Sequence, residues 1–239
     1  MTASACPAAT DALVSGSAMG WIRNALATVA AFVVSGCATP PPDGLTVYEN
    51  YDRPAHQADD PAKVVVKVST ARQRVYVMEE SRLLLVMPVT VGAPATPTPH
   101  GDFGITEKDA RHRASDHGFR HRGDRVEKSY RRETPGGWSF TGRPMPYWCG
   151  FEPGYGFHTG WVKHFPSSDG CIRMHRNLAP KFFQLVRVGT PVIIRETLPE
   201  DAKHANIPLP PDAGPLPDYP GTYYLGEGVF TDHLQPRFR

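Results

Sequence analysis

The sequence predicts a mainly β domain with one or two short helices and extended flanking segments. The prediction rests on short runs of β-branched and aromatic residues separated by polar stretches, and on only one clear helical stripe of apolar residues. The 25 prolines among 239 residues cluster at 40–61, 94–99 and 199–220. This distribution indicates a compact middle between extended flanks.

The first 37 residues are typical of a secretion signal. Arg23 precedes an apolar stretch at 25–34 that is too short to span a bilayer well. The stretch ends in Val34-Ser35-Gly36-Cys37, which resembles the lipobox of bacterial lipoproteins, so we expect Cys37 to be lipidated. An ordinary cleaved signal with a chance cysteine is the alternative. The lack of basic residues before Met19 favours Met19 as the start of translation.

The rest of the chain divides into three parts. Residues 38–62 are rich in proline, aspartate and other polar residues, and we expect them to form a tether between membrane and domain. The folded domain is expected to span 63–196. A proline-rich C-terminal extension, 197–239, carries scattered aromatic residues, and the sequence does not decide whether it packs on the domain.

The first strands of the domain are predicted at 63–68 and 74–78, where β-branched and aromatic residues dominate. The pattern continues through 83–87 and 89–91. Pro88 interrupts it, because proline cannot donate to a strand ladder, and so predicts an edge position or a bulge.

A proline-rich turn at 93–99 leads to another short strand at 101–106. Residues 108–132 contain nine Lys or Arg against four acids and show no apolar periodicity. We therefore expect a long, exposed loop there. The formal charge of the whole chain is only +2, which by itself argues for neither nucleic acid nor an anionic membrane as a partner.

One helix is predicted over 178–188, where Leu178, Phe182, Leu185 and Val186 form one apolar stripe. Asn177 is the expected N-cap and Gly189 the expected stop. A closing strand is predicted at 192–194.

The most informative stretch is Ser168-Asp169-Gly170-Cys171-Ile172-Arg173-Met174, which follows Phe157-His158-Thr159-Gly160. Cysteine and histidine within reach of each other can form a nucleophile and its base: His158 would take the thiol proton and return it to a leaving amine. Glycine beside the nucleophile permits a tight turn, so the amide N–H groups of Gly170 and Cys171 can face an oxyanion. Taken alone, such a pair also fits a structural role.

These residues resemble the L,D-transpeptidase catalytic domain, also called the YkuD domain. That family carries a His-Gly or His-Ser element followed by Ser/Thr-His-Gly-Cys-apolar-Arg/Asn. Residues 168–173 match this second element except at Asp169, where the family usually has histidine. Other segments resemble the family in its order, and the likeness covers about 63–196: Arg74-Val75-Tyr76-Val77, Val91-Gly92, Thr98-Pro99-His100-Gly101-Asp102-Phe103 and Met145-Pro146-Tyr147-Trp148.

The resemblance implies a β-sandwich-like fold with Cys171 at the end of a groove, and a reaction without metal or organic cofactor. Cys171 would attack the amide between the third residue of a peptidoglycan stem tetrapeptide and its terminal D-alanine, forming a thioester. An amine of a neighbouring stem or of a wall-attached protein would then take the acyl group. The orienting group for His158 would be the backbone carbonyl of Thr159.

The candidate substrate-binding residues are Arg173, Ser168, Trp148 and Tyr147. Arg173 either binds a substrate carboxylate or fixes the loop. An ionised Asp169 can only accept hydrogen bonds, so we expect its carboxylate to point away from the oxyanion and to hold a backbone N–H or Arg173. A solvent-facing Asp169 without a role is the alternative.

The four cysteines, Cys6, Cys37, Cys149 and Cys171, show no spacing of a metal knuckle or a disulfide framework. A disulfide between Cys149 and Cys171 would block the nucleophile, so Cys149 is predicted to be a free, partly buried thiol. No histidine has a recognisable ligand spacing to Cys171, and no metal site is expected.

Two alternatives to a transpeptidase stay open. One is an L,D-carboxypeptidase or amidase of the same fold, and the other is a catalytically silent wall-binding lipoprotein. The expected partners are stem peptides and a membrane through the lipid anchor, with no nucleic acid. The expected place is the periplasm at the outer membrane, because Ala38 rather than aspartate follows Cys37. The basic residues of 108–132 form either a solvated surface or a rim that attracts stem carboxylates.

Overall fold

The computed structural model describes residues 44–210 and 219–231, all of which belong to the unit Pro41–Arg239. The predictions for 1–37, including Met19 and Cys37, therefore lie outside the described residues. None of the helices within the described ranges has the length and hydrophobicity needed to span a bilayer.

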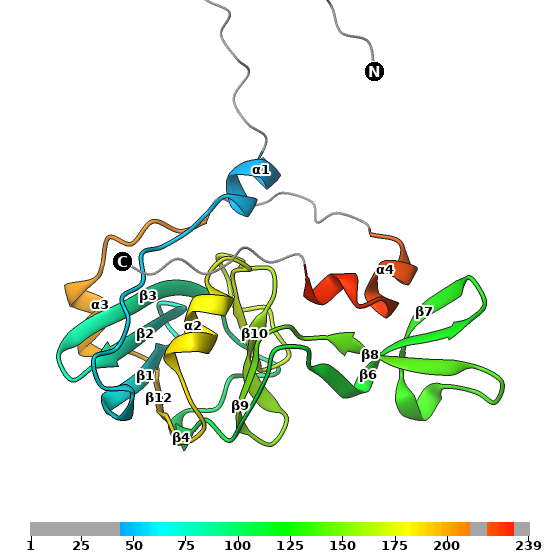
Figure 1. Ribbon diagram of the computed structural model, residues 1–239, viewed down its shortest axis with the longest axis horizontal. Helices are drawn as coiled ribbons and strands as arrows, with labels where there is room; N and C mark the ends of the chain where they lie inside the picture. Colours follow the sequence, from blue (N-terminus) through cyan, green and yellow to red (C-terminus); the bar gives the residue numbers. More distant parts are fainter. Residues whose placement is uncertain (1–43, 211–218, 232–239) are drawn as a thin grey trace, which may run out of the picture. The chain divides into compact units, whose positions relative to one another are not determined.

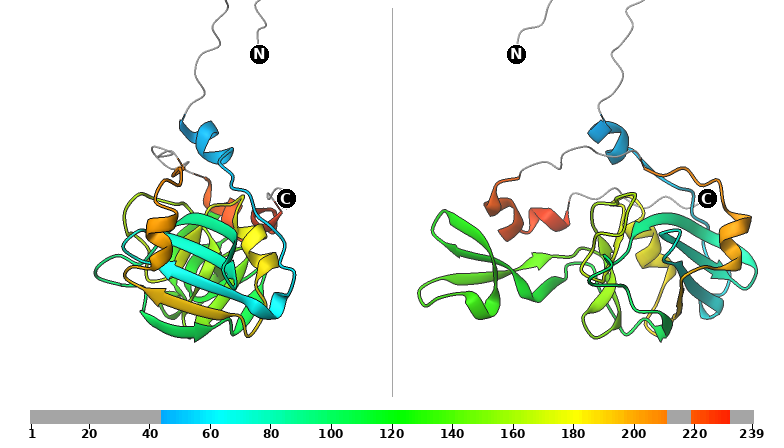
Figure 2. Two further views of the ribbon diagram at one scale, coloured as in Figure 1. Left: turned by 90° about the vertical axis from the view of Figure 1, so that its left-hand side faces the viewer. Right: turned by 180° about the vertical axis from the view of Figure 1, so that it is seen from behind.

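The main body is one nine-stranded sheet that curls around a buried apolar core (Figures 1 and 2). Its strands are β1 (Val64–Ser69), β2 (Arg74–Glu79), β3 (Arg82–Thr90), β4 (Gly101–Gly104), β5 (Glu107–Asp109), β9 (Trp148–Glu152), β10 (Tyr155–Thr159), β11 (Ile172–Met174) and β12 (Pro191–Arg195). They are ordered β4-β12-β1-β2-β3-β11-β10-β9-β5. The predicted mainly β fold is thus confirmed, with a curled sheet as the layer that encloses the core.

The strand β3 runs through Pro88 without a break or a bulge, but Pro88 has no partner strand on one side, which agrees with the predicted edge position. The N–H of the next residue, Val89, donates to Gln73 O on the β2 side. Because successive N–H groups alternate along a strand, the nitrogen of Pro88 faces the opposite edge. There the pairing with β11 includes only Val89 and Thr90, so Pro88 removes no ladder hydrogen bond.

The predicted exposed loop at 108–132 is also wrong. Residues in this region form β6 (Arg113–Arg122) and β7 (Arg125–Tyr130), joined to β8 (Ser139–Pro144) in a three-stranded sheet of order β7-β6-β8 (Figure 1). A short 3-10 turn, η2 (Arg131–Glu133), follows β7. Ion pairs accommodate some of these charges: Glu127 accepts from Arg120 across the strands and from Arg125 on its own strand, each at 2.6 Å.

The predicted helix is observed as α2 (Ala179–Leu185), which packs Phe182 into the core against Phe157 at 4.7 Å between ring centroids. Its N-cap is Leu178, and Asn177 instead donates its amide to Glu49 O and Tyr51 O. The helix ends earlier than predicted. Lys108 Nζ donates to the carbonyls of Phe183 and Val186, both at 2.6 Å, and so satisfies acceptors at the C-terminal end of the helix.

The predicted tether does not hold for the part of 38–62 that the structure describes. Here α1 (Gly44–Glu49), an extended segment and η1 (Pro61–Lys63) lie against the domain. Tyr48 is 3% exposed, Ala55 is fully buried, and Asp52 pairs with the buried Lys181 at 2.7 Å. Aromatic and small residues spaced among the polar ones bury enough surface to dock this segment.

The C-terminal extension packs on the domain wherever it is described. Its helices are α3 (Pro199–Lys203), α4 (Gly221–Leu225) and the 3-10 turn η3 (Gly228–Phe230). In α3, the buried Asp201 accepts hydrogen bonds from Ser69 Oγ and Tyr76 Oη, both at 2.8 Å. In α4, Tyr224 stacks on Phe119 of β6 with ring centroids 5.0 Å apart.

Candidate active site

The parallel pairing of β10 with β11 brings the two candidate catalytic residues to one end of the sheet. In this ladder His158 lies opposite Arg173. Cys171 directly precedes β11 and packs on the small cluster of Ala114, Met145 and Trp148. The loop between the two strands returns the chain to the same place, so residues distant in sequence become neighbours.

The backbone of the loop around Cys171 is held by Ser168. Its hydroxyl donates to Cys171 O at 2.5 Å and accepts from Gly170 N at 3.2 Å. Thr98 Oγ1 donates to Gly170 O at 2.8 Å, and Ser168 forms a β-bridge with Gly92. Ser168 is only 1% exposed, so its hydroxyl acts inside the loop and contact with a substrate stays a prediction.

Gly170 lies where no side chain fits. Its φ of +109° is in a region that L-residues rarely adopt. A Cβ there would lie 2.5 Å from Cε1 of Tyr155. The approach of Tyr155 to the backbone therefore requires glycine before the cysteine.

The two backbone N–H groups expected to bind an oxyanion differ in availability. The N–H of Gly170 already donates to Ser168 Oγ. The N–H of Cys171 has no acceptor among the described residues, so it is free to bind a substrate oxygen. The N–H of Cys171 can therefore bind an oxyanion directly. The N–H of Gly170 can do so only if its hydrogen bond to Ser168 Oγ breaks.

His158 is fixed in one neutral tautomer. Its Nδ1 lies 2.8 Å from Thr159 O, and because a carbonyl only accepts, Nδ1 carries the proton. Nε2 is then the unprotonated nitrogen that can accept one. The N–H of Thr159 donates to Pro146 O at 2.8 Å and anchors the peptide that orients the ring.

The surroundings of the pair favour uncharged forms of both groups. Burial lowers the pKa of His158 to about 3, while the hydrogen bond to Thr159 O acts in the opposite direction. Burial also raises the pKa of the Cys171 thiol above its usual value, against smaller opposing effects of the Gly156 N–H and the Arg173 charge. At neutral pH the resting pair is a thiol beside a neutral imidazole.

The thiol of Cys171 donates to Gly154 O at a sulfur-to-oxygen distance of 3.7 Å. No hydrogen bond joins it to His158 within the described part of the chain. The proton transfer between them therefore needs a rotation of the thiol toward Nε2, and a hydrogen bond of this kind commonly tightens only when substrate binds.

Trp148 forms the wall behind the pair. It is 4% exposed, donates its indole N–H to Glu107 Oε1 at 2.7 Å and stacks on His112 at 4.7 Å. Its ring lies 6.3 Å from that of His158. Trp148 thus excludes water from one side of His158, while direct contact with a substrate stays a prediction.

Tyr147 points elsewhere. It has a left-handed backbone with φ of +57°, and its ring meets Phe183 of α2 edge-on at 5.5 Å. It packs against the main core, whereas Trp148 next to it packs with Cys171. The turn at Tyr147, directly before β9 begins at Trp148, separates the two aromatic rings. A substrate contact for Tyr147 also stays a prediction.

Arg173 is half-buried beside Cys171, and its guanidinium makes no hydrogen bond or ion pair with the residues described. Burial and the nearby charge of Arg143 lower its pKa, while Asp169 and Cys171 raise it. Asp169 itself is exposed and has no hydrogen-bond partner among those residues. The hydrogen bond predicted for Asp169 is therefore absent, and its carboxylate acts on Arg173 only through its charge.

Sequence reasoning missed Arg143 and His117, whose charges act on His158 from the three-stranded sheet. His117 lies in the predicted loop at 108–132, and no strand was predicted at β8, which carries Arg143. The one available signal is that Arg143 lies just before the Met145–Trp148 segment, which the sequence analysis had already singled out.

Cys149 and Cys171 are both free, so no disulfide joins them. Cys149 is fully buried in the main core, and burial raises its pKa to about 12. Over residues 44–210 and 219–231, no group of three or more His, Cys, Asp or Glu is placed to hold a metal ion.

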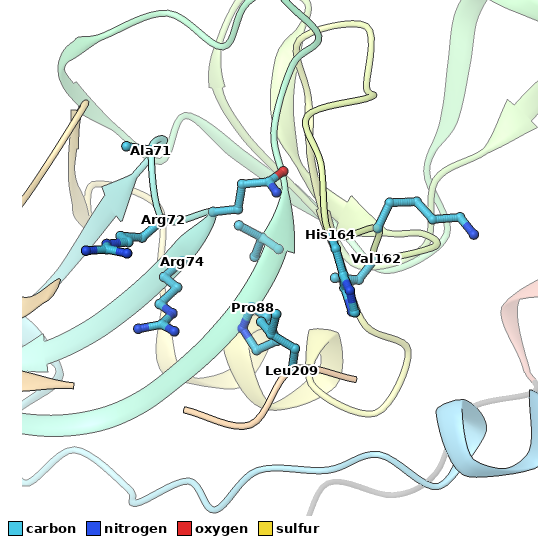
Figure 3. Close-up of a pocket in the computed structure, with 10 residues that line it drawn as sticks. Ala71, Arg72, Arg74, Pro88, Val162, His164 and Leu209 are labelled. Carbon is cyan, nitrogen blue, oxygen red and sulfur yellow. The ribbon is translucent and has the colours of Figure 1, made fainter. Parts of the chain in front are cut away.

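A cavity of about 220 Å³ has neither Cys171 nor His158 among its lining residues. Figure 3 shows the residues that line it. It is lined from β2 and β3 and from the segment that leads to the catalytic loop, with basic side chains among its walls: Arg72, Arg74, Lys163 and His164. Arg74 donates to the carbonyls of His204 and Ala205, so this side chain serves to hold the C-terminal extension.

The protein-family model of the L,D-transpeptidase catalytic domain (YkuD) matches residues 63–194 of the sequence. No curated protein sequence matches the chain.

Several solved L,D-transpeptidase structures are similar. One from Mycobacterium smegmatis is 18% identical, with a TM-score of 0.44 over 56% of this chain and 58% of that one. One from Stackebrandtia nassauensis is 19% identical, with a TM-score of 0.43 over 65% and 66%. One from Xylanimonas cellulosilytica is 18% identical, with a TM-score of 0.43 over 60% and 65%. The chain thus spans less than two thirds of the length of each of these structures.

Proposed function

Because the chain belongs to the L,D-transpeptidase catalytic domain (YkuD) family, we propose that it is a cysteine-dependent L,D-transpeptidase acting on peptidoglycan stem peptides. The single observation that carries this proposal is the site at the ends of β10 and β11. There the parallel pairing of the two strands brings a free cysteine to the same end of the sheet as a histidine whose Nδ1 donates to Thr159 O. Only glycine fits directly before this cysteine.

The first half of the reaction acylates the enzyme. Nε2 of His158 takes the Cys171 proton as the sulfur attacks the amide carbonyl between the third stem residue and the terminal D-alanine. The electron pair of the carbonyl moves onto oxygen, where the N–H of Cys171 stabilises it. When the carbon–nitrogen bond breaks, His158 returns the proton to the departing nitrogen. D-Alanine leaves, and a thioester on Cys171 remains.

The second half transfers the acyl group. An amine of a neighbouring stem, or of a protein side chain, attacks the thioester and gives up a proton to His158. The carbon–sulfur bond breaks and the thiol is restored by that proton. No metal or organic cofactor takes part in either half.

Because Cys171 and His158 are both uncharged at rest, we infer that His158 acts as a general base during the attack. A thiolate–imidazolium pair formed before substrate binds is not needed. Burial holds the imidazole ready to accept a proton, because the pKa of His158 is lowered to about 3. The thiol keeps its proton until substrate arrives, which protects it from adventitious alkylation and oxidation.

We also propose, from the sequence alone, that lipid on Cys37 holds the enzyme at a membrane of the cell envelope, facing the wall. Metabolic labelling with a fatty-acid analogue tests this directly. Labelled protein whose mature chain begins at Cys37 is the expected result, and an unlabelled, soluble protein with another N-terminus would contradict it.

Mass spectrometry of muropeptides incubated with the full chain tests the catalytic proposal. Tetrapeptide muropeptides should yield dimers linked through the third residue of the donor, with release of D-alanine. Tripeptide products alone would identify an L,D-carboxypeptidase, and unchanged tetrapeptides would identify a silent binding protein. The variant Cys171→Ala should give no product and serves as the control.

A further inference from the structure

Two arginines within electrostatic reach of His158 lack partners. Arg173 on β11 and Arg143 on β8 make no hydrogen bond or ion pair within residues 44–210 and 219–231. Three other arginines of the three-stranded sheet are paired, since Arg113 donates to several carbonyls and Arg120 and Arg125 donate to Glu127. Arg122, also without such a partner among the described residues, is exposed and is not among the charges that lower the pKa of His158. Each of the two unpaired charges lowers the pKa of His158, which places both within electrostatic reach of the site.

A large bulge in β6 positions the end of β8 that carries Arg143. Arg113 pairs with Pro144 and Gly118 pairs with Gly142. The chain therefore advances five residues along β6 but only two along β8 between these two pairs. The backbones approach so closely that a Cβ on Gly142 would lie 1.9 Å from Ala114 O. Bulges of this kind bend a strand and redirect its side chains.

The same end of β8 contacts the catalytic residues directly. Met145 packs in the cluster that includes Cys171. One residue further, Pro146 O accepts the N–H of Thr159, the residue that orients His158. Arg143 is therefore two residues from a side chain that belongs to the wall of the active site.

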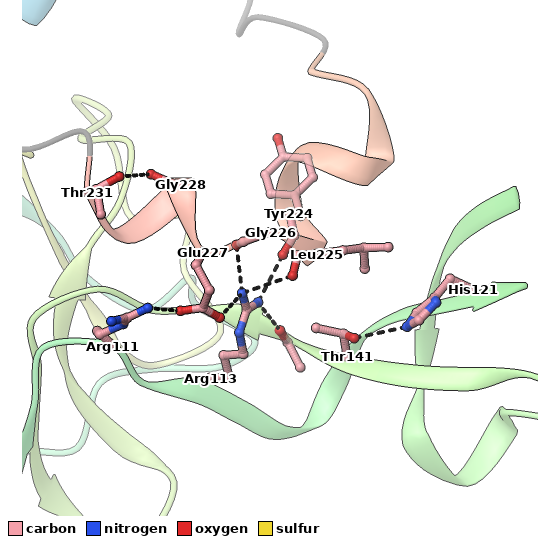
Figure 4. A network of polar contacts seen from close by, with 11 residues as sticks. Arg111, Arg113, His121, Thr141, Tyr224, Leu225, Gly226, Glu227, Gly228 and Thr231 are labelled. Atoms are coloured by element: carbon pink, nitrogen blue, oxygen red, sulfur yellow. Dashed lines mark hydrogen bonds and ion pairs between the residues drawn. The ribbon is translucent and has the colours of Figure 1, made fainter. Parts of the chain in front are cut away.

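The C-terminal extension braces this arrangement (Figure 4). Arg113 donates to Gly142 O at 3.2 Å and to the carbonyls of Tyr224 and Gly226, each at 2.9 Å. Glu227 forms ion pairs with Arg111 and Arg113. The residue before Arg143 is thus tied to the segment 219–231.

Two unpaired guanidinium groups within electrostatic reach of His158 and of each other can bind a carboxylate with paired, charge-assisted hydrogen bonds. The scissile carbonyl carbon must reach Cys171. In a stem that ends one residue later, the terminal carboxylate is three bonds away from that carbon, or roughly 3–4 Å. The other stem carboxylates are separated from it by longer chains.

We propose that Arg143 and Arg173 together bind the terminal carboxylate of the departing D-alanine. This assignment rests on the proposed function and specifies the donor: a stem whose free carboxylate follows directly on the scissile bond. Arg173 lies on the strand of the nucleophile and Arg143 on the bulged sheet, so the carboxylate is held from two sides.

Binding to a form that cannot react tests the assignment. In the full chain with Cys171→Ala, isothermal titration should show that a stem tetrapeptide with a free terminal carboxylate binds more tightly than its C-terminal carboxamide. We expect a factor of about 10 or more, in keeping with a hydrogen-bonded charge pair. Adding Arg143→Ala should remove most of this preference, and Arg143→Lys should keep part of it because the charge remains without the fork.

Arg122→Ala is the matched control, because Arg122 is an exposed arginine of β6 and its substitution removes the same charge. This variant should leave the preference for the carboxylate peptide unchanged. Equal affinity for the two peptides, or a preference that survives Arg143→Ala, would overturn the assignment. Acylation of the chain with Cys171 intact, followed in parallel by mass, tests the proposed function separately. A carboxylate preference without acylation would refute the function and leave the binding site standing.

Discussion

Gly170 holds the backbone before the reactive thiol in a conformation that a side chain would prevent. Its positive φ and the approach of the Tyr155 ring act together, because one disfavours any L-residue and the other leaves no space for a Cβ. The loop must then keep Cys171 in place through Ser168 and Thr98. The position of Cys171 thus depends on Gly170 having no Cβ.

The variant Gly170→Ala should lose acylation by at least about a hundredfold, because the backbone strain of a few kcal/mol has to be relieved by moving the loop. The measurement is the rate of acyl-enzyme formation by intact mass. Gly189→Ala is the control: Gly189 also has a positive φ, +89°, but a Cβ there meets nothing within 4 Å. Equal losses in both variants would show that crowding by Tyr155 has no part in the effect.

The neutral state of His158 makes a prediction for pH. Because burial lowers the pKa of His158 to about 3, the imidazole stays able to accept a proton well below pH 6.5. Because burial raises the pKa of Cys171, the thiol keeps its proton at neutral pH.

We therefore expect kcat/KM for acylation to stay level between about pH 5 and pH 8, since neither group changes its protonation in that window. A stopped-flow series over this range measures it. A fall in rate with a midpoint near 6.5, the usual value for histidine, would mean that His158 is not held neutral by its surroundings.

The three-stranded sheet β7-β6-β8 is the element through which the C-terminal extension can affect the active site. Arg113 joins Gly142 O to the carbonyls of Tyr224 and Gly226. Its loss would leave these carbonyls without their donor and free the end of β8 to shift.

In Arg113→Ala, hydrogen exchange in residues 219–231 should accelerate, and acylation of a carboxylate-ending stem should slow by several-fold as Arg143 loses its support. Arg122→Ala removes an exposed arginine from the same strand and should change neither measurement. Unchanged exchange in Arg113→Ala would show that other contacts, such as the stacking of Tyr224 on Phe119, hold the segment.

Elements that depend on local pattern were predictable from the sequence, whereas those that depend on tertiary contact were not. The strands at 63–68 and 74–78 and the helix near 178 follow from side-chain periodicity, and each is observed. The hairpin of β6 and β7 was missed because its alternation is hidden by charged residues that pair across the strands.

The same distinction applies to the site. The sequence motifs identify Cys171 and His158. Only the parallel pairing of β10 with β11 brings the two residues to the same end of the sheet. The end of β8 that carries Arg143 is positioned by a bulge in β6 between Arg113 and Gly118, which no local pattern signals. The docking of 44–62 depends on the buried His175, whose Nε2 donates to Tyr48 O at 2.8 Å.

At the scale of the whole molecule, the flanks on both sides of the family domain are fastened to it by buried polar groups. His175 is fully buried, donates from Nε2 to Tyr48 O and accepts at Nδ1 from the N–H of Asn177. Both ring nitrogens are therefore used in the neutral form. Burial lowers the pKa of His175 to about 4, with the hydrogen bond to Tyr48 O opposing the change.

The free energy of unfolding should consequently decrease as the pH falls from about 6.5 toward about 4, because the unfolded chain binds a proton that the folded His175 refuses. The lowered pKa of His158 acts in the same direction. Thermal unfolding midpoints across this range should fall less steeply in His175→Gln than in the natural chain. His56→Gln, at an exposed histidine, should keep the natural slope, and equal slopes in all three proteins would contradict the account.

The central claim is that Cys171 carries the acyl group, and the mass of the intact protein tests it most directly. After incubation with a stem tetrapeptide, the natural chain should gain the mass of the tripeptide acyl group, with loss of D-alanine. Peptide mapping should place the adduct on Cys171, and neither Cys171→Ala nor a control without peptide should show it. An adduct that persists in Cys171→Ala, or one found on Cys149, would contradict the account.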